Sequence, residues 1–130
     1  MGQSHIMTES DDCPFCQVAS PVLEQGSAYA IYDRFPVTPG HMLIITRRHV
    51  SSWFDTTFEE RQALLELADE AKDRLVEQYR PGGFNLGVNV GEVAGQTIGH
   101  VHLHLIPRYP GDVANPRGGV RGVIPERQHY

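Results

Sequence analysis

The feature that most restricts the fold is a row in which histidine alternates with apolar residues, His-Val-His-Leu-His-Leu-Ile over residues 100–106. Alternation with a period of two is typical of a β-strand, in which successive side chains point to opposite faces. We therefore expect a strand over these residues, ended by Pro107, with the histidines on one face and an apolar layer on the other. The three histidines are His100, His102 and His104.

Other patterns predict more strands and one long helix. Alternating or β-branched runs at 28–33, 42–46 and 84–90 are typical of strands. A capping box at Thr56 or Thr57 begins a helix that carries one apolar stripe and is ended by Pro-Gly-Gly at 81–83. The stripe consists of Leu64, Leu67, Ala68, Ala71 and Leu75. Strands, one helix and further strands indicate an α+β fold with a largely antiparallel sheet.

The chain length of 130 residues fits one domain. We interpret residues 1–6 as vector-derived, residues 7–112 as the domain, and residues 113–130, rich in Gly, Pro and Arg, as an extended tail. A net charge of −5 without a basic stripe argues against binding to duplex nucleic acid. The sequence contains no apolar run long enough to cross a membrane and no apparent secretion signal, so we expect a cytoplasmic protein without a membrane partner.

Three imidazoles on one strand face are costly to bury without partners, so the row predicts a functional site. One interpretation is metal binding, because imidazole is the commonest metal ligand. The other is nucleophilic catalysis, because a neutral imidazole can attack phosphorus and form a labile phosphoramidate. A preceding loop, residues 91–97, favours phosphate chemistry, since its glycines admit an anion and Gln96 and Thr97 offer donors.

The only two cysteines, Cys13 and Cys16, are spaced as Cys-Pro-Phe-Cys. In a cytosolic chain this spacing indicates a metal half-site or a redox pair, or two incidental thiols, rather than a structural disulfide. A redox pair is not supported by other thioredoxin-like features. A zinc site needs two further ligands, for which His49 is a candidate.

The segment from Gly95 to Asp112, with His-φ-His-φ-His-φ-φ at its centre (φ apolar), resembles the signature of the histidine triad (HIT) family of nucleotide hydrolases and transferases. The similarity covers about residues 13–112. It implies a HIT-like sheet of about five strands with one long helix, dimerising across a two-fold axis. It also implies a nucleotide or dinucleotide substrate and no organic cofactor.

The same resemblance implies a role for individual residues. His102 would attack the α-phosphate and form a nucleotidyl-histidine intermediate, while His104 would contact the phosphate and help the leaving group to depart. Asp33 would bind the ribose hydroxyls, Gln96 and Thr97 would contact the phosphate, and the Asn89 side chain would reach the nucleotide. Apolar residues around Ile31 and Phe35 would hold the base.

The run after the triad, from Leu105 to Asp112, is more similar to the dinucleoside polyphosphate hydrolase branch of the family. The alternatives are an adenosine phosphoramidase, a dinucleoside polyphosphate phosphorylase, a hydrolase with a metal held by the triad, and a nucleotide-binding regulatory protein with vestigial catalysis. Arg117 and Arg121 either reach a polyphosphate or are solvated. We assign no function to His41, expected at a turn or strand entry, or to His129 in the tail.

Resemblance to the wider HIT superfamily, including galactose-1-phosphate uridylyltransferases, also bears on the cysteines. It implies a structural Zn²⁺ bound by Cys13, Cys16, His49 and His100. This assignment separates His100 from the two catalytic histidines.

Overall fold

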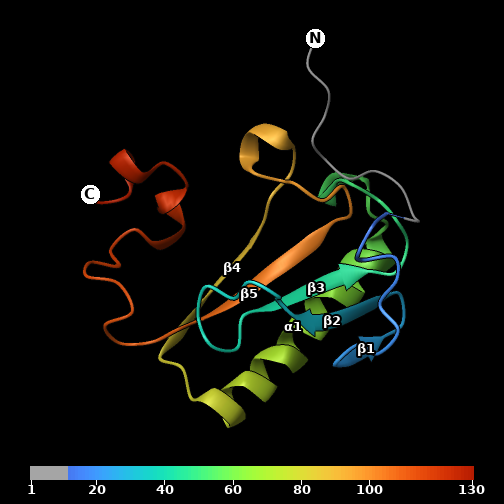
Figure 1. Ribbon diagram of the computed structural model, residues 1–130, viewed down its shortest axis with the longest axis horizontal. Coiled ribbons are helices and arrows are strands. Elements are labelled where there is room, and N and C mark those ends of the chain that lie inside the picture. Colours follow the sequence, from blue (N-terminus) through green and yellow to red (C-terminus); the bar gives the residue numbers. More distant parts are fainter. Residues whose placement is uncertain (1–11) are drawn as a thin grey trace.

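The computed structural model describes residues 12–130, in which an antiparallel five-stranded sheet packs one face against a long helix (Figure 1). Neighbouring strands follow the order β1-β2-β3-β5-β4. The strands are β1 (Leu23–Gln25), β2 (Ala28–Tyr32), β3 (Met42–Thr46), β4 (Gly83–Val88) and β5 (His102–Arg108), and the helix is α1 (Phe58–Tyr79). The predicted α+β fold is thereby confirmed. The interpretation of residues 1–6 as vector-derived lies outside the described residues.

Helix α1 begins and ends where local chemistry predicts. Thr57 caps its N-terminus, because its hydroxyl accepts a hydrogen bond from the Glu60 N–H while the Glu60 carboxylate accepts one from the Thr57 N–H. At the other end Arg80 adopts a left-handed conformation with φ of 51°, and Pro81 follows. The predicted apolar stripe of α1 is buried against the sheet.

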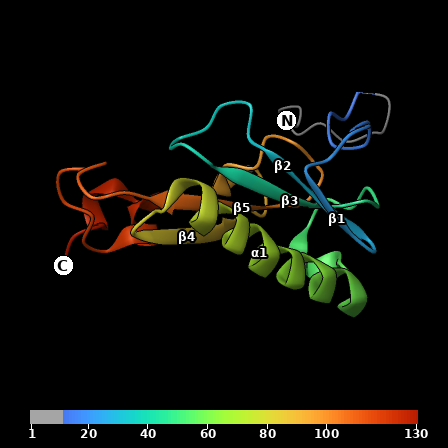
Figure 2. The same ribbon diagram turned by 90° about the horizontal axis from the view of Figure 1, so that it is seen from below.

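The two faces of the sheet have different coverings, as Figure 2 shows. Helix α1 covers one face, where it packs on Ala30, Met42, Ile44, Leu103 and Leu105. On the opposite face Tyr29, Leu43 and Ile45 pack against Cys13 and Phe15, from the segment before β1. In the register of β3 and β5, Leu43 pairs with His104 and Ile45 with His102, so both histidines share this second face.

Strand β5 differs from the prediction at both ends. It begins at His102, so His100 precedes it in a bend, and it continues through Pro107 to Arg108. Pro107 pairs with Phe84 of β4, but β3 ends its pairing with β5 at Leu105. The Pro107 carbonyl instead accepts a hydrogen bond from the Thr38 hydroxyl, at 2.6 Å. The proline therefore sits where its missing N–H faces no partner strand, which is why it does not end β5.

Two further segments were not predicted. Strand β1 has only three residues, too few to show a period, and Gly26, with φ of 55°, joins it to β2. The segment expected to be an extended tail instead contains two short 3₁₀ helices, η3 (Gly119–Val123) and η4 (Pro125–Arg127). The other two 3₁₀ helices are η1 (Trp53–Asp55) and η2 (Glu92–Ala94). Among residues 12–130, no helix combines the length and apolar character needed to span a membrane.

Candidate active site and metal centre

A cavity of about 520 Å³ lies on the sheet face opposite α1. Residues predicted to bind a nucleotide line it from four parts of the chain: Asp33 after β2, Asn89 after β4, Thr97 from the loop before β5, and His102 and His104 from β5. Its remaining wall is largely apolar and includes Phe15, Val18, Ile31 and Phe35. The fold thus brings five predicted site residues together around one cavity.

His102 is held in the tautomer that a nucleophile needs. Its Nδ1 lies 2.9 Å from the backbone oxygen of His100, an acceptor, so Nδ1 carries the proton and donates it to that carbonyl. The lone pair is therefore on Nε2, the other ring nitrogen. Burial lowers the pKa of His102, which outweighs the raising effects of the His100 carbonyl and of Asp33. A neutral ring with an available lone pair can attack phosphorus at neutral pH.

His104 has the opposite tautomer because of His41, a residue to which the sequence analysis assigned no function. The Val37 N–H donates to His41 Nδ1, so His41 carries its proton on Nε2. That nitrogen lies 3.0 Å from His104 Nδ1, which must accept, so the proton of neutral His104 is on Nε2. Burial, followed by the proximity of His102 and His41, lowers the pKa of His104 to about 4. His104 is therefore a neutral hydrogen-bond donor.

A signal for His41 was present in the sequence. It precedes Leu43 by two residues, and Leu43 pairs with His104. Side chains two positions apart share a face and reach the diagonal neighbour on the paired strand. Knowing that β3 pairs with β5 in this register would have identified His41 as a neighbour of the triad.

Asp33, the first residue after β2, lies beside His41 and His104. One carboxylate oxygen accepts from the Phe35 N–H at 2.9 Å, and the other lies 3.4 Å from His41 Nε2. The ligating atoms of Asp33, His41 and His104 lie within 4.8 Å of one another, a spacing that could also hold a metal ion. The hydrogen bonds that begin at the Val37 N–H account for this cluster without one.

Gln96 lies elsewhere than expected. Its side chain is buried, its oxygen accepts from the Gly91 N–H at 2.9 Å, and its nitrogen donates to the carbonyls of Ser51 and Ile98. Gln96 does not line the cavity. The amide therefore holds the loop together from inside, and the expected contact between this side chain and phosphate is not supported by its placement.

The four predicted zinc ligands meet beside the cavity. The Sγ of Cys16 lies 3.1 Å from Nδ1 of His49 and 3.5 Å from Nδ1 of His100, and the Sγ of Cys13 lies 3.4 Å from the latter. All four ligand atoms lie within 4.8 Å of one another. In a tetrahedral zinc site sulfur and nitrogen ligands are separated by about 3.5 Å, given Zn–S of about 2.3 Å and Zn–N of about 2.0 Å. The donor set and its spacing therefore fit zinc.

Backbone contacts orient His100 toward this cluster. Its Nε2–H donates to the Thr46 carbonyl at 2.6 Å, which leaves the lone pair on Nδ1, the nitrogen that faces the sulfurs. His100 is fully buried, and burial lowers its pKa, so the ring is neutral as a metal ligand must be.

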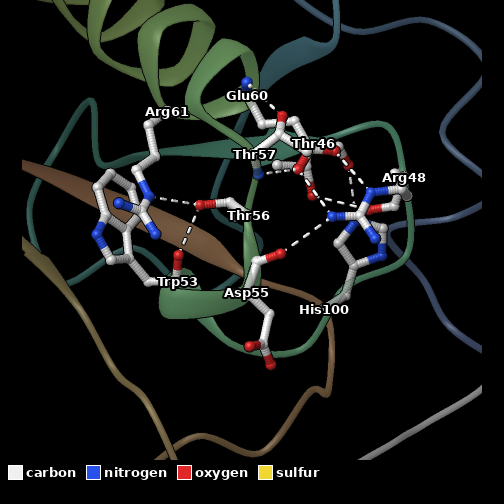
Figure 3. Close-up of polar contacts among 9 residues, drawn as sticks. All are labelled: Thr46, Arg48, Trp53, Asp55, Thr56, Thr57, Glu60, Arg61 and His100. Carbon is white, nitrogen blue, oxygen red and sulfur yellow. Dashed lines mark hydrogen bonds and ion pairs between the residues drawn. The ribbon is translucent and has the colours of Figure 1, made fainter.

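Figure 3 shows how this region is tied to the start of α1. The hydroxyl of Thr46 donates to the carbonyl of Arg48, and the Arg48 guanidinium makes two hydrogen bonds of 2.9 Å to Glu60. Glu60 is buried, and its bonds to Arg48 lower its pKa. Because Glu60 is also the third residue of α1 and forms the capping box with Thr57, the turn that carries His49 is anchored to the helix.

The C-terminal arginines do not reach the triad within this chain. Arg121 donates to the carbonyls of Arg127 and Gln128, and its guanidinium stacks on Tyr130. Arg117 stacks on the same ring, and neither arginine lines the cavity with His102. His129 contacts the Asn115 carbonyl at 3.0 Å. These residues therefore organise the segment after Asp112.

Several known proteins have amino-acid sequences similar to this one. An uncharacterised 16.1 kDa HIT-like protein of Mycoplasma pneumoniae is 35% identical over 77% of this chain and 74% of its own length. The AP-4-A phosphorylase of Mycobacterium tuberculosis is 36% identical over 65% of this chain, which spans 44% of that enzyme. The bis(5'-adenosyl)-triphosphatase of Dictyostelium discoideum is 35% identical over 68% of this chain and 59% of its own length.

Solved structures share the fold. A HIT family protein from Bacillus anthracis has a TM-score of 0.73 and 36% identity, covering 80% of this chain and 78% of that one. A Zn-bound histidine triad family protein from Mycobacterium smegmatis has a TM-score of 0.73 and 30% identity, covering 82% of both chains. Residues 17–111, which include the whole sheet, α1 and the three triad histidines, match the HIT domain. The chain belongs to the HIT family.

Proposed function

We propose that the protein cleaves a nucleoside phosphoryl bond, in a dinucleoside polyphosphate or an adenosine phosphoramidate, through a nucleotidyl-His102 intermediate. The observation that carries this proposal is the pairing of tautomers at the cavity. His102 Nδ1 and His104 Nδ1 are both occupied by hydrogen bonds, so one ring keeps a lone pair on Nε2 and the other a proton. Relatives named as an AP-4-A phosphorylase and a bis(5'-adenosyl)-triphosphatase support this class of substrate.

The reaction has two balanced steps. In the first, the lone pair on His102 Nε2 attacks the α-phosphorus, and the bond from phosphorus to the leaving group breaks. A leaving phosphate oxygen keeps the electron pair as an anion, whereas a leaving nitrogen takes up a proton from solvent and departs as an amine. The His104 Nε2–H donates a hydrogen bond to the charge that develops there. In the second, water attacks the same phosphorus, its proton is lost, and the N–P bond breaks to release the nucleotide and restore the lone pair of His102. Two inversions retain the configuration at phosphorus.

The rest of the cavity would hold the nucleotide. The carboxylate of Asp33 suits the two hydroxyl donors of a ribose. Asn89 and Thr97 line the cavity near the triad and offer polar contacts to the phosphate, while Ile31 and Phe35 offer an apolar wall for the base. The Asp33 assignment predicts that AMP binds more tightly than its 2'-deoxy form, and that Asp33→Ala removes most of this difference.

We further assign Cys13, Cys16, His49 and His100 as ligands of a structural zinc ion. The donor spacing supports this assignment, and so does the Zn-bound relative from Mycobacterium smegmatis. Bound there, the ion would supply a cross-link between the segment before β1, the turn after β3 and His100, two residues before His102. Metal analysis of protein purified without chelator should find one zinc per chain, and substantially less would contradict the assignment.

The experiment that tests the proposed reaction compares the protein with His102→Ala on a panel of substrates. The panel contains dinucleoside polyphosphates of different lengths, an adenosine phosphoramidate and an aminoacyl adenylate analogue. We expect turnover of at least one compound, its near-complete loss in His102→Ala, retained AMP binding in that variant, and labelled His102 with a slow substrate. Unchanged turnover in His102→Ala, or AMP binding without turnover of any panel member, would contradict catalysis by this residue.

A phosphorylase is the second candidate, favoured by the similarity to the AP-4-A phosphorylase. The two reactions share the first step and differ in the acceptor. When inorganic phosphate is added, a phosphorylase releases the bound nucleotide as a nucleoside diphosphate, whereas a hydrolase releases a monophosphate. Product analysis with and without phosphate therefore decides between them.

A further inference from the structure

The loop from Cys13 to Cys16, called here the cysteine loop, belongs to two sites at once. Its first and last residues place their sulfur atoms in the metal cluster. Its two middle residues, Pro14 and Phe15, line the cavity that contains the triad. Phe15 is almost fully buried, and its ring meets the ring of His102 edge-on at 5.0 Å between centroids.

His100 forms a second connection between the two sites. Its side chain faces the sulfurs through Nδ1, and its ring also contacts Phe15 at 6.0 Å between centroids. Its backbone oxygen accepts the hydrogen bond that sets the tautomer of His102. A displacement of His100 would therefore move both the metal ligand and the group that orients the nucleophile.

In the described part of the chain, apolar packing on Tyr29, Leu43 and Ile45 and a small set of hydrogen bonds hold the cysteine loop in place. The buried hydroxyl of Tyr29, on β2, donates to the carbonyl of Phe15, and the Cys16 N–H donates to the Cys13 carbonyl at 3.2 Å within the loop. Burial raises the pKa of Tyr29, so its hydroxyl stays protonated and able to donate. A metal bound by both sulfurs and by two imidazoles from other segments would add four directional bonds to these contacts.

We propose that zinc binding and nucleotide binding are coupled in this protein, with Phe15 as the residue that transmits the coupling. The inference rests on the proposed zinc site and nucleotide cavity. Metal held by Cys13 and Cys16 fixes the loop between them, so the cavity wall made by Phe15 is formed before the nucleotide arrives. The bound nucleotide in turn packs on that wall and stabilises the loop in its metal-binding shape. Linkage requires the two effects to be equal.

The test measures both halves of this cycle. AMP affinity is measured by calorimetry on zinc-loaded protein and on protein freed of zinc by a chelator. Zinc affinity is measured by equilibrium competition with a chromogenic chelator, with and without saturating AMP. We expect zinc to strengthen AMP binding by about tenfold and AMP to strengthen zinc binding by the same factor.

Two matched variants isolate the route. Phe15→Ala truncates the cavity wall inside the cysteine loop, and Ile31→Ala truncates the wall on β2, outside that loop. Both should weaken AMP binding. Only Phe15→Ala should bring the coupling factor close to one, while all four metal ligands remain. Circular dichroism of the zinc-free protein shows whether α1 survives. If the chain unfolds without zinc, coupling through unfolding would persist in both variants, and this result would overturn the role of Phe15.

The outcomes separate this inference from the function beneath it. Absence of AMP binding in every form would refute the proposed nucleotide site, and absence of bound zinc would refute the metal assignment, and the inference would fail with either. If AMP and zinc both bind but neither changes the affinity of the other, the proposed function stands and the coupling is wrong. Coupling that is lost in Phe15→Ala and kept in Ile31→Ala supports it.

Discussion

Each histidine of the site owes its role to the partner of one ring nitrogen. A backbone carbonyl holds the proton of His102 on Nδ1, whereas the Thr46 carbonyl holds that of His100 on Nε2. His41, itself oriented by a backbone N–H, holds the proton of neutral His104 on Nε2. Chemically identical side chains are thus prepared for the three proposed roles of nucleophile, metal ligand and donor.

The role of His41 can be tested by substitution. Replacing it with Leu removes the donor that fixes His104, so we expect kcat to fall by about 100-fold. AMP affinity should change little, because His41 does not line the cavity. His41→Gln, whose amide can donate to His104, should recover part of the lost kcat. Steady-state kinetics measures kcat, and calorimetry measures AMP affinity. A wild-type kcat in His41→Leu would refute this role of His41.

The lowered pKa values of His41 and His104 predict how stability depends on pH. Burial keeps both neutral in the folded protein, His104 down to about pH 4, whereas in the unfolded chain such groups titrate near 6.5. Between these values the unfolded chain binds more protons, so the free energy of unfolding should fall as pH drops from 6.5 toward 4. Urea unfolding at several pH values measures this, and His104→Gln should flatten the dependence.

The position of a residue in the site could be predicted from the sequence only where that position depends on the local pattern alone. Alternation alone placed His102 and His104 on one face, and both line the cavity. The functions of His41 and Gln96 were missed or misassigned because they depend on hydrogen-bond partners far along the chain. Gln96, for example, bonds to Ser51, and only the tertiary fold brings these residues together.

At the scale of elements, the site combines a rigid sheet with irregular loops. Strand β5 is an inner strand with β3 and β4 on either side, so the backbone that carries His102 and His104 is hydrogen-bonded along both edges. The loop before β5 contains η2, and the residues of η2 are not paired with any strand of the described sheet. Its shape depends on the buried side-chain amide of Gln96, which accepts a hydrogen bond from one backbone N–H and donates to two backbone carbonyls.

Gln96→Ala should therefore loosen this loop. Losing the amide leaves backbone groups without partners, which costs about 1–3 kcal/mol of unfolding free energy. AMP binding should also weaken, because Thr97 and Asn89 adjoin the loop. Val93→Ala, at an exposed position in the same loop, is the control and should change neither quantity. Urea denaturation and calorimetry check both; an unaltered AMP affinity in Gln96→Ala would argue against this supporting role.

Elements with strong periodic signals were predictable, and those defined by their neighbours were not. The strand at 42–46 and the helix after Thr57 coincide with β3 and α1, since burial pattern and capping are local. The prediction that Pro107 ends the strand was wrong because a proline ends a strand only where its missing N–H would face a partner strand. Whether β3 extends that far is decided by pairing register, which no single segment encodes.

At the scale of the whole molecule, the described sheet ends in an edge strand, β4. In the described part of the chain β4 pairs with β5 alone, and an edge strand of this kind is available to a second copy. Leu86 on β4 and Leu65 and Val76 on α1 are about half exposed. An apolar surface beside a strand edge is what a two-fold dimer would cover.

We therefore expect a homodimer through β4 and α1. Sedimentation analysis should give twice the mass of one 14.5 kDa chain. Leu86→Lys places a charge at the expected interface and should shift the protein toward monomer, while Val93→Lys, at an exposed position on η2, should not. A wild-type protein that sediments as a monomer at micromolar concentration would contradict this expectation.

The separation of the metal ligands along the chain has a consequence for biosynthesis. Cys13 and His100 are 87 residues apart, and only Val101 lies between His100 and the start of β5. During translation the cysteines and His49 emerge long before the fourth ligand. A four-coordinate site formed by these residues would therefore be complete only after most of the domain has left the ribosome, so the proposed zinc would be acquired late in the maturation of each new chain.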